Sequence, residues 1–238
     1  MLTAADLLAA GTVDLELMAY LMCCMHRGAS VITCAGPGGT GKTTLLGALL
    51  CFLPGDVELK VVHGRESYRE TGVCYLCHEL GHGWFSYLWG AEARALLEVA
   101  QAKDRRYCAT TAHADELDEL RQLLTESDIV LSDRAFAHID LVIFMRRFAS
   151  LGRALRRVTD VYRGTGDAGQ SHEHVSRWDR RSDTFVWRRS DGDGWHTTAP
   201  MHDELEEYRA FLGFLLRERM VHVADVRKAV LDFYTRMK

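Results

Sequence analysis

Proline is scarce in this sequence, with only 3 among 238 residues, and the 20 glycines are clustered rather than periodic. Collagen-like and proline-rich disordered chains are therefore excluded. Basic residues are not in excess either, because 29 Lys and Arg stand against 33 Asp and Glu. The formal charge of −4 argues against binding of nucleic acid or anionic lipid by the protein as a whole. A hydrophobic fraction of 47% is ordinary for a folded chain with a core.

The sequence also lacks a disulfide framework and a membrane span. Its 7 cysteines, an odd number, are scattered through apolar stretches, which is typical of a reducing cytosol. Met1–Ala10 carries Asp6 and no basic cluster, and the uncharged stretch Leu17–Met25 is too short to cross a bilayer. We expect a cytoplasmic protein without membrane insertion, free or peripheral to a membrane-associated assembly.

The pattern of apolar residues indicates one domain with four segments. Residues 1–27 are expected to form two short amphipathic helices, separated at Gly11-Thr12, that act as a lid. Residues 28–150 alternate strands with helices, as in a mostly parallel α/β sheet flanked by helices. Residues 151–200 are expected to form an antiparallel β appendage, and residues 201–238 two amphipathic helices.

The expected strands of the core cover residues 30–35, 58–63, 73–77, 107–111, 129–131 and 139–145. Those of the appendage cover 157–162, 174–178 and 184–188. Further helices are expected over 42–52, 92–102, 117–124, 203–220 and 225–237.

A glycine-rich loop directly follows the first expected strand. It runs Gly36, Pro37, Gly38, Gly39, Thr40, Gly41, Lys42, Thr43, Thr44 and matches the Walker A pattern between a strand and a helix. Glycines in such a loop let backbone N–H groups face phosphate oxygens, and the helix N-terminus adds partial positive charge. We expect these residues to bind ATP, with Lys42 on the β and γ phosphates and the Thr43 hydroxyl on Mg²⁺.

A phosphate loop does not by itself distinguish a kinase, a GTPase and a motor. Hydrolysis needs a carboxylate at the end of a neighbouring strand, and Glu79 follows the strand at 73–77 as the expected catalytic and metal-binding carboxylate. Glu92, on the next helix, is either its partner or a solvated acid. His113 follows the strand at 107–111 and is a candidate sensor of the γ phosphate; the alternative is a surface histidine in a polar turn.

A competing pattern overlaps Glu79. His78-Glu79-Leu80-Gly81-His82 spells H-E-x-x-H, in which a helix places two imidazoles on one face to bind zinc. A strand-like run leads into this segment, and Gly81 and Gly83 weaken a helix there. Cys74-x-x-Cys77 lies beside it without a second ligand pair. A zinc metallopeptidase is thus a less favoured alternative, and a nucleotide-binding switch with little turnover is another.

Taken together, the segments resemble the ATPase domain of the secretion ATPase superfamily, which serves type II secretion, type IV pili and type IV secretion. The similarity covers about residues 1–165 and rests on DLLAAGTVDLELMAYL, GPGGTGKTTLLGALLCFLP, CYLCHELG, WGAEARALLEVA, TTAHAD, IDLVIFMRR and RRVTDVYRG. TTAHAD looks like the family's His box and CYLCHELG like its Walker B strand. The nearest match to its acidic box is Glu66 in VVHGRES.

The resemblance implies a P-loop NTPase with a RecA-like sheet, hydrolysing Mg-ATP within a homo-oligomeric ring, hexameric in the family. Lys42, Thr43, Glu79 and His113 would then lie at the nucleotide. It further implies partners in secretion, pilus or conjugation machinery, and it does not indicate direct nucleic acid binding. The sequence has no counterpart of the family's N-terminal domain before Thr3, so an arginine acting in trans is expected from the group Arg146, Arg147, Arg156 and Arg157.

Overall fold

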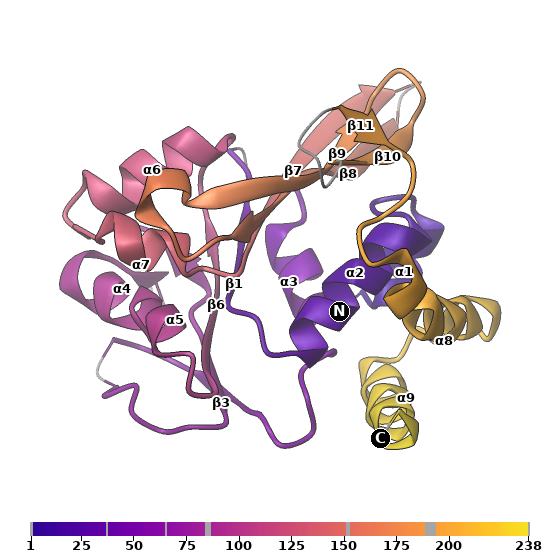
Figure 1. The fold of residues 1–238 in the computed structure, drawn as a ribbon, viewed down its shortest axis with the longest axis horizontal. Helices are drawn as coiled ribbons and strands as arrows, with labels where there is room; N and C mark the ends of the chain where they lie inside the picture. Colours follow the sequence, from indigo (N-terminus) through magenta and orange to yellow (C-terminus); the bar gives the residue numbers. More distant parts are fainter. Residues whose placement is uncertain are drawn as a thin grey trace.

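A computed structural model of the protein describes residues 2–36, 38–64, 66–83, 87–150, 153–188 and 194–237, apart from the side chains of Ser150 and Arg153. The described chain folds around one 11-stranded sheet (Figure 1). The main path of the sheet runs β11-β10-β9-β8-β7-β1-β6-β3-β2, and the short strand β4 pairs with β5 and β6. This mixed α/β architecture agrees with the fold class predicted from the sequence.

One half of the sheet is parallel. Its strands are β1 (Val31–Cys34), β2 (Glu58–Val61), β3 (Val73–Leu76), β4 (Glu79–Leu80), β5 (Tyr87–Leu88) and β6 (Arg106–Ala112). In the register of the sheet, β1 lies between β6 and the first residues of β7. Because the carboxyl ends of parallel strands meet at one edge, the loops that follow β1 and β6 lie side by side.

The other half is antiparallel and continues the same sheet. It consists of β7 (Leu141–Ser150), β8 (Arg153–Gly164), β9 (His172–Asp179), β10 (Thr184–Arg188) and β11 (Trp195–His196). Strand β7 joins the two halves, because residues 141–144 pair with β1 and the whole strand pairs with β8. The antiparallel strands expected from the sequence are therefore an extension of the core sheet.

Helices cover both faces of the sheet (Figure 1). One face carries α1 (Ala4–Ala9), α2 (Leu15–His26), α3 (Lys42–Leu50), α8 (Glu206–Arg217) and α9 (Val223–Arg236). The other carries α4 (Gly90–Leu97), α5 (Val99–Ala102), α6 (Leu117–Thr125) and α7 (Asp133–Ala137). Side chains alternate between the two cores along β1, where Val31 faces the first and Ile32 the second.

Helix α2 is a core helix rather than part of a lid. Its residues 17–23 are all buried, because the helix lies between the sheet, α3 and α8. A helix that is apolar on all sides is normally buried, so the uncharged run Leu17–Met25 indicates a buried helix. Asp14 caps the helix by accepting a hydrogen bond from the Leu17 N–H at 2.8 Å.

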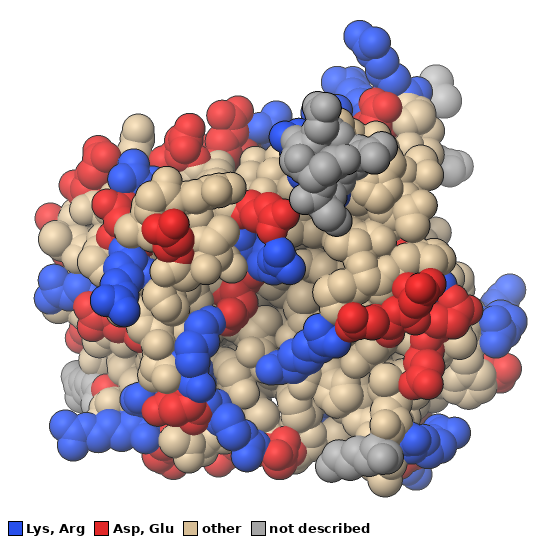
Figure 2. Space-filling model, in the orientation of Figure 1, with Lys and Arg blue, Asp and Glu red and all other residues tan. Residues whose placement is uncertain are grey.

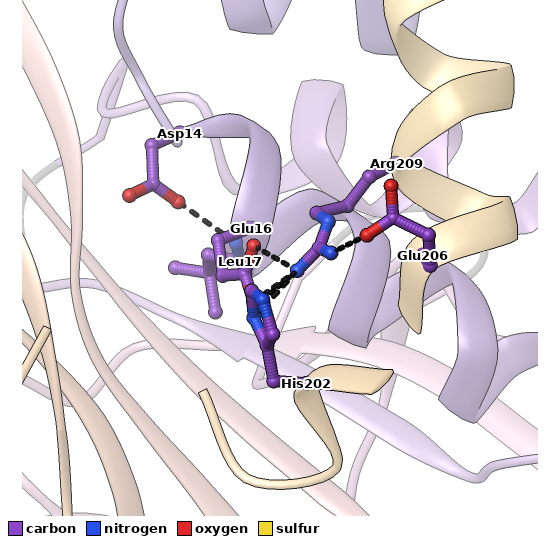
Figure 3. A network of polar contacts seen from close by, with 6 residues as sticks. All are labelled: Asp14, Glu16, Leu17, His202, Glu206 and Arg209. Carbon is purple, nitrogen blue, oxygen red and sulfur yellow. Dashed lines mark hydrogen bonds and ion pairs between the residues drawn. The ribbon is translucent and has the colours of Figure 1, made fainter. Parts of the chain in front are cut away.

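A polar network fastens α8 to the start of α2 (Figure 3). Arg209 on α8 lies 2.9 Å from both carboxylate oxygens of Glu16, and it also contacts Glu206. His202 Nδ1 lies 2.8 Å from Glu16 Oε1. The C-terminal helices are thereby tied to the N-terminal segment, although the two are far apart in the sequence.

The expected strand at 129–131 is wrong. Ile129 lies in a turn, and Val130 has a φ of 51°, outside the extended region. Ile129 and Leu131 are apolar because they point into the core beneath α6, and not because the segment pairs in the sheet. None of the helices in the described part of the chain is long and apolar enough to span a bilayer.

Acidic and basic side chains are mixed over the face of the molecule in Figure 2. The largest acidic area on that face lies over the start of α8, where residues 203, 204, 206 and 207 are all Asp or Glu.

Candidate functional site

The glycine-rich loop connects the end of β1 to the start of α3. Gly39 and Gly41 have φ values of 74° and 107°, in the left-handed region that side chains disfavour. Gly41 immediately precedes α3, so Lys42 is the first residue of the helix. Pro37 lies outside the described residues. The loop thus has the strand, turn and helix arrangement that its sequence predicts.

Gly36 is held from both sides by the segment after β6. The Asp115 carboxylate accepts a hydrogen bond from the Gly36 N–H at 3.0 Å, and His113 Nδ1 lies 2.6 Å from the Gly36 carbonyl oxygen. A Cβ atom at position 36 would lie 2.3 Å from Asp115 Oδ2. A side chain at position 36 would therefore displace the Asp115 carboxylate from its hydrogen bond to the Gly36 N–H.

Lys42 is buried, and its ammonium group points to the end of β6. Its Nζ lies 3.3 Å from His113 Nδ1 and 3.5 Å from the Ala35 carbonyl oxygen. Burial lowers the pKa of Lys42, and the Glu79 carboxylate partly opposes this shift. A buried lysine ammonium of this kind can bind an anionic ligand that enters beside it.

Glu79 and His113 are in direct contact. His113 Nε2 lies 2.6 Å from Glu79 Oε1, and the Thr111 hydroxyl lies 3.3 Å from Glu79 Oε2. Strand β4 runs beside β6, with Leu80 opposite Ala112, so the two residues come from neighbouring strands. The side chain of Glu79 is only 15% exposed. The carboxylate and the imidazole form one polar unit next to Lys42.

These groups open into a single cavity of about 630 Å³. Among the residues predicted as sites, those that line the cavity are Gly38, Gly39, Thr40, Gly41, Lys42, Thr43, Thr44, Glu79 and His113. The exposed Thr43 lies in the first turn of α3. The hydroxyl of Thr40 is buried and has no hydrogen-bond partner within the described chain. The cavity therefore gathers cationic, hydroxyl and carboxylate groups around the loop.

Two carboxylates suggested by the sequence lie elsewhere. Glu66 accepts hydrogen bonds from the backbone N–H groups of His63 and Gly64, both at 2.9 Å, and so orders the loop after β2. Glu92 approaches the same loop, since a Cβ on Gly64 would lie 2.5 Å from Glu92 Oε2. Neither residue is among the described residues that line the cavity.

The four candidate arginines have different surroundings. Arg156 Nε donates to the Gly39 carbonyl oxygen at 3.3 Å, so this arginine reaches the loop of its own chain. Arg157 is buried and pairs with Asp183 at 3.1 Å, in the turn between β9 and β10. Arg146 lies 3.3 Å from the Asp115 carbonyl oxygen, and Arg147 is exposed.

Sequence reasoning missed the role of Asp115 and the placement of Arg156 within its own chain. Asp115 stands in TTAHAD, two residues after His113, so the two side chains could be expected to leave the strand on the same side. The position of Arg156 depends on the pairing of β7 with both β1 and β8. The sequence carries no local signal for that pairing.

The zinc-binding pattern does not form the helix that it requires. Glu79 and Leu80 form strand β4, and residues 81 and 82 lie in a bend. Cys74 and Cys77 belong to the two opposite cores of the sheet. Among the described residues, no three His, Cys, Asp or Glu side chains come together as a metal-binding group.

No protein-family model and no curated protein matches the chain. The chain is similar to the VirB11 ATPase from the Brucella suis type IV secretion system, crystallised in complex with sulphate, at 20% identity and a TM-score of 0.47. The similarity covers 71% of this chain and 57% of that one, so this chain spans little more than half of its length.

Proposed function

We propose that the protein is a P-loop ATPase with a RecA-like core that binds Mg-ATP at residues 36–44 and hydrolyses it. Lys42 would bind the β and γ phosphates, Glu79 would act as the catalytic carboxylate, and His113 would sense the γ phosphate. Within the loop, Gly36, Pro37, Gly38, Gly39, Thr40, Gly41, Thr43 and Thr44 would surround the phosphates.

The observation that carries this proposal is the convergence of Lys42, His113 and Glu79 at the mouth of the loop. Lys42 Nζ lies 3.3 Å from His113 Nδ1, and His113 Nε2 lies 2.6 Å from Glu79 Oε1. A phosphate entering between Lys42 and His113 would take both as partners, because anions are favoured at a helix N-terminus beside a buried cation. Glu79, which contacts His113, would then orient the attacking water.

The residues present also fit magnesium. Mg²⁺ keeps several water ligands and needs only one or two protein oxygens besides the phosphates. The Thr43 hydroxyl and the Glu79 carboxylate line the same cavity and supply such oxygens. When bound, the ion neutralises charge on the phosphate oxygens, while Thr43 and Glu79 hold it in place.

We further propose that the protein works as a homo-oligomer, hexameric by family resemblance, in a secretion, pilus or conjugation-type assembly. The support is the sequence resemblance over about residues 1–165, from DLLAAGTVDLELMAYL to RRVTDVYRG. Arg147, exposed on β7, is the best placed of the four candidate arginines to reach a neighbouring subunit, since the other three contact groups of their own chain.

Replacement of Lys42 tests the proposal. Lys42→Ala should abolish measurable ATP binding and phosphate release, whereas Lys228→Ala, at an exposed position on α9, should leave both unchanged. Binding is measured by titration with a fluorescent ATP analogue and turnover by steady-state phosphate release. Unchanged binding in Lys42→Ala would refute the site. Stoichiometric binding by the wild type without phosphate release, alone or with added membranes, would indicate a nucleotide switch instead.

A further inference from the structure

The lining of the cavity extends beyond the glycine-rich loop to residues that lie directly against it, since a Cβ on Gly41 would lie 3.4 Å from both Met145 Cε and Arg156 Cδ. Besides Lys42, Thr43 and Glu79, the cavity is lined by Leu2, Leu7, Ala10 and Thr12 of the N-terminal segment and by Met145, Leu155 and Arg156 of β7 and β8. We call this second set the distal end of the cavity. We call the rest of the lining, formed by residues 38–44, Glu79 and His113, the phosphate end. Tyr87 belongs to the phosphate end because it pairs in register with Glu79. The distal end is therefore mainly apolar.

The backbone groups of the N-terminal segment at this end are already hydrogen-bonded. The Thr12 N–H donates to the Leu7 carbonyl oxygen at 3.0 Å, and the Thr12 carbonyl oxygen accepts from the Val158 N–H at 2.9 Å. The Ala10 carbonyl oxygen accepts from the Arg157 guanidinium at 3.4 Å. The Thr12 N–H is thus not free to donate to a ligand, and the two carbonyl oxygens each already have a partner in the protein.

Polar side chains are few at the distal end. Among its described residues only Thr12 and Arg156 carry a polar side chain, and Thr12 is 4% exposed. Asp, Asn and Gln commonly form hydrogen bonds with the polar edge of a nucleobase, and none of them is among the described residues of the distal end. The whole sequence contains no asparagine. Arg156 is held by the Gly39 carbonyl oxygen, and its planar guanidinium can stack on any base or pair with phosphate.

We propose that the distal end binds the nucleobase by apolar contact and by stacking on Arg156, without reading its hydrogen-bonding edge, so that ATP and GTP are used with little discrimination. The inference rests on the proposed function of the phosphate end. A site built to form hydrogen bonds with one ligand rejects an analogue by about 10⁴-fold or more, whereas apolar contact discriminates far less. The same protein should therefore accept purine nucleoside triphosphates of either kind.

Competition binding with the full chain tests the inference. ATP, GTP and inorganic tripolyphosphate are each titrated in the presence of Mg²⁺ against a fluorescent ATP analogue. We expect ATP and GTP affinities within about tenfold of each other, with tripolyphosphate weaker than both. A ratio above about tenfold between ATP and GTP would overturn the inference. If neither nucleotide nor tripolyphosphate binds, the proposed function itself fails, which is a different result.

A variant pair locates the base. Leu155→Ser, at a half-buried position of the distal end, should lower ATP and GTP affinities together by about fivefold, because part of an apolar contact is lost. Tripolyphosphate affinity should not change. Leu216→Ser, on the outer side of α8 and 38% exposed, is the matched control and should alter none of the three. Equal affinities in Leu155→Ser and wild type, for folded proteins with the same melting temperature, would place the base elsewhere.

Discussion

The contact between Glu79 and His113 is predicted to act as one unit in hydrolysis. Glu79→Gln preserves the size of the side chain but replaces the carboxylate that lies 2.6 Å from His113 Nε2 with an uncharged amide. His113→Gln removes the imidazole from the same contact and from its place beside Lys42. Each substitution breaks the alignment of the carboxylate, so each should slow phosphate release for the same reason.

The expected size of the effect follows from this shared contact. Loss of a positioned acid–base group commonly slows a reaction by about 10²- to 10⁴-fold, and we expect about 10² for each single variant. If the two residues were independent, the double variant would be slower by about 10⁴-fold. Because both substitutions break the same contact, we expect phosphate release by the double variant to be slower than wild type by about 10²-fold.

ATP affinity should behave differently from turnover. Glu79→Gln removes a negative charge near Lys42 and also one of the two proposed magnesium ligands, so the two effects oppose each other and ATP affinity should change far less than turnover. Steady-state phosphate release and titration with a fluorescent ATP analogue separate the two quantities. Glu92→Gln is the control, because Glu92 lies at the loop after β2 and should leave turnover within about twofold of wild type. Multiplicative losses in the double variant, or unchanged turnover in Glu79→Gln, would refute the reasoning.

Two further predictions concern the arginines of β8. Asp183→Asn should lower the free energy of unfolding by about 0.5–1 kcal/mol and Tm by about 1–4 °C, because the buried Arg157 loses a carboxylate partner that is itself 59% exposed and screened by solvent. The hydrogen bonds from Arg157, the main cause, and from Trp178 lower the pKa of Asp183. Its stabilising effect is therefore present above the carboxyl's ordinary pKa and lost as pH falls through the folded value, so thermal melts of the two proteins should converge below about pH 4. Arg156→Ala should weaken ATP binding by the same subunit that carries the substitution. Mixing this variant with Lys42→Ala should therefore restore no turnover, whereas recovery on mixing would show that Arg156 acts in trans.

Local sequence patterns were sufficient to predict the loop and its neighbours. The strand, glycine and helix sequence around residues 36–44 determines the backbone, because only glycine readily adopts the φ values found at 39 and 41. The strand run before His113 places this residue at the carboxyl end of β6, and Glu79 follows β3 as the first residue of the short strand β4. A run of apolar residues alone could not distinguish the turn at Ile129 from a strand, since either buries the same side chains.

The amino-acid order by itself determined the parallel core, the glycine-rich loop between β1 and α3 and the set of polar residues near it, since these depend on φ preferences and on alternation within short segments. Only the tertiary structure decided that Arg156 reaches the loop of its own chain, that Asp115 occupies the space beside Gly36, and that the N-terminal segment closes the distal end of the cavity. These contacts join residues 79 to 147 positions apart, brought together because β1 pairs with β6 on one side and β7 on the other, and β7 pairs in turn with β8. Pairing over such separations is set by the packing of the whole sheet, which no local window of sequence contains.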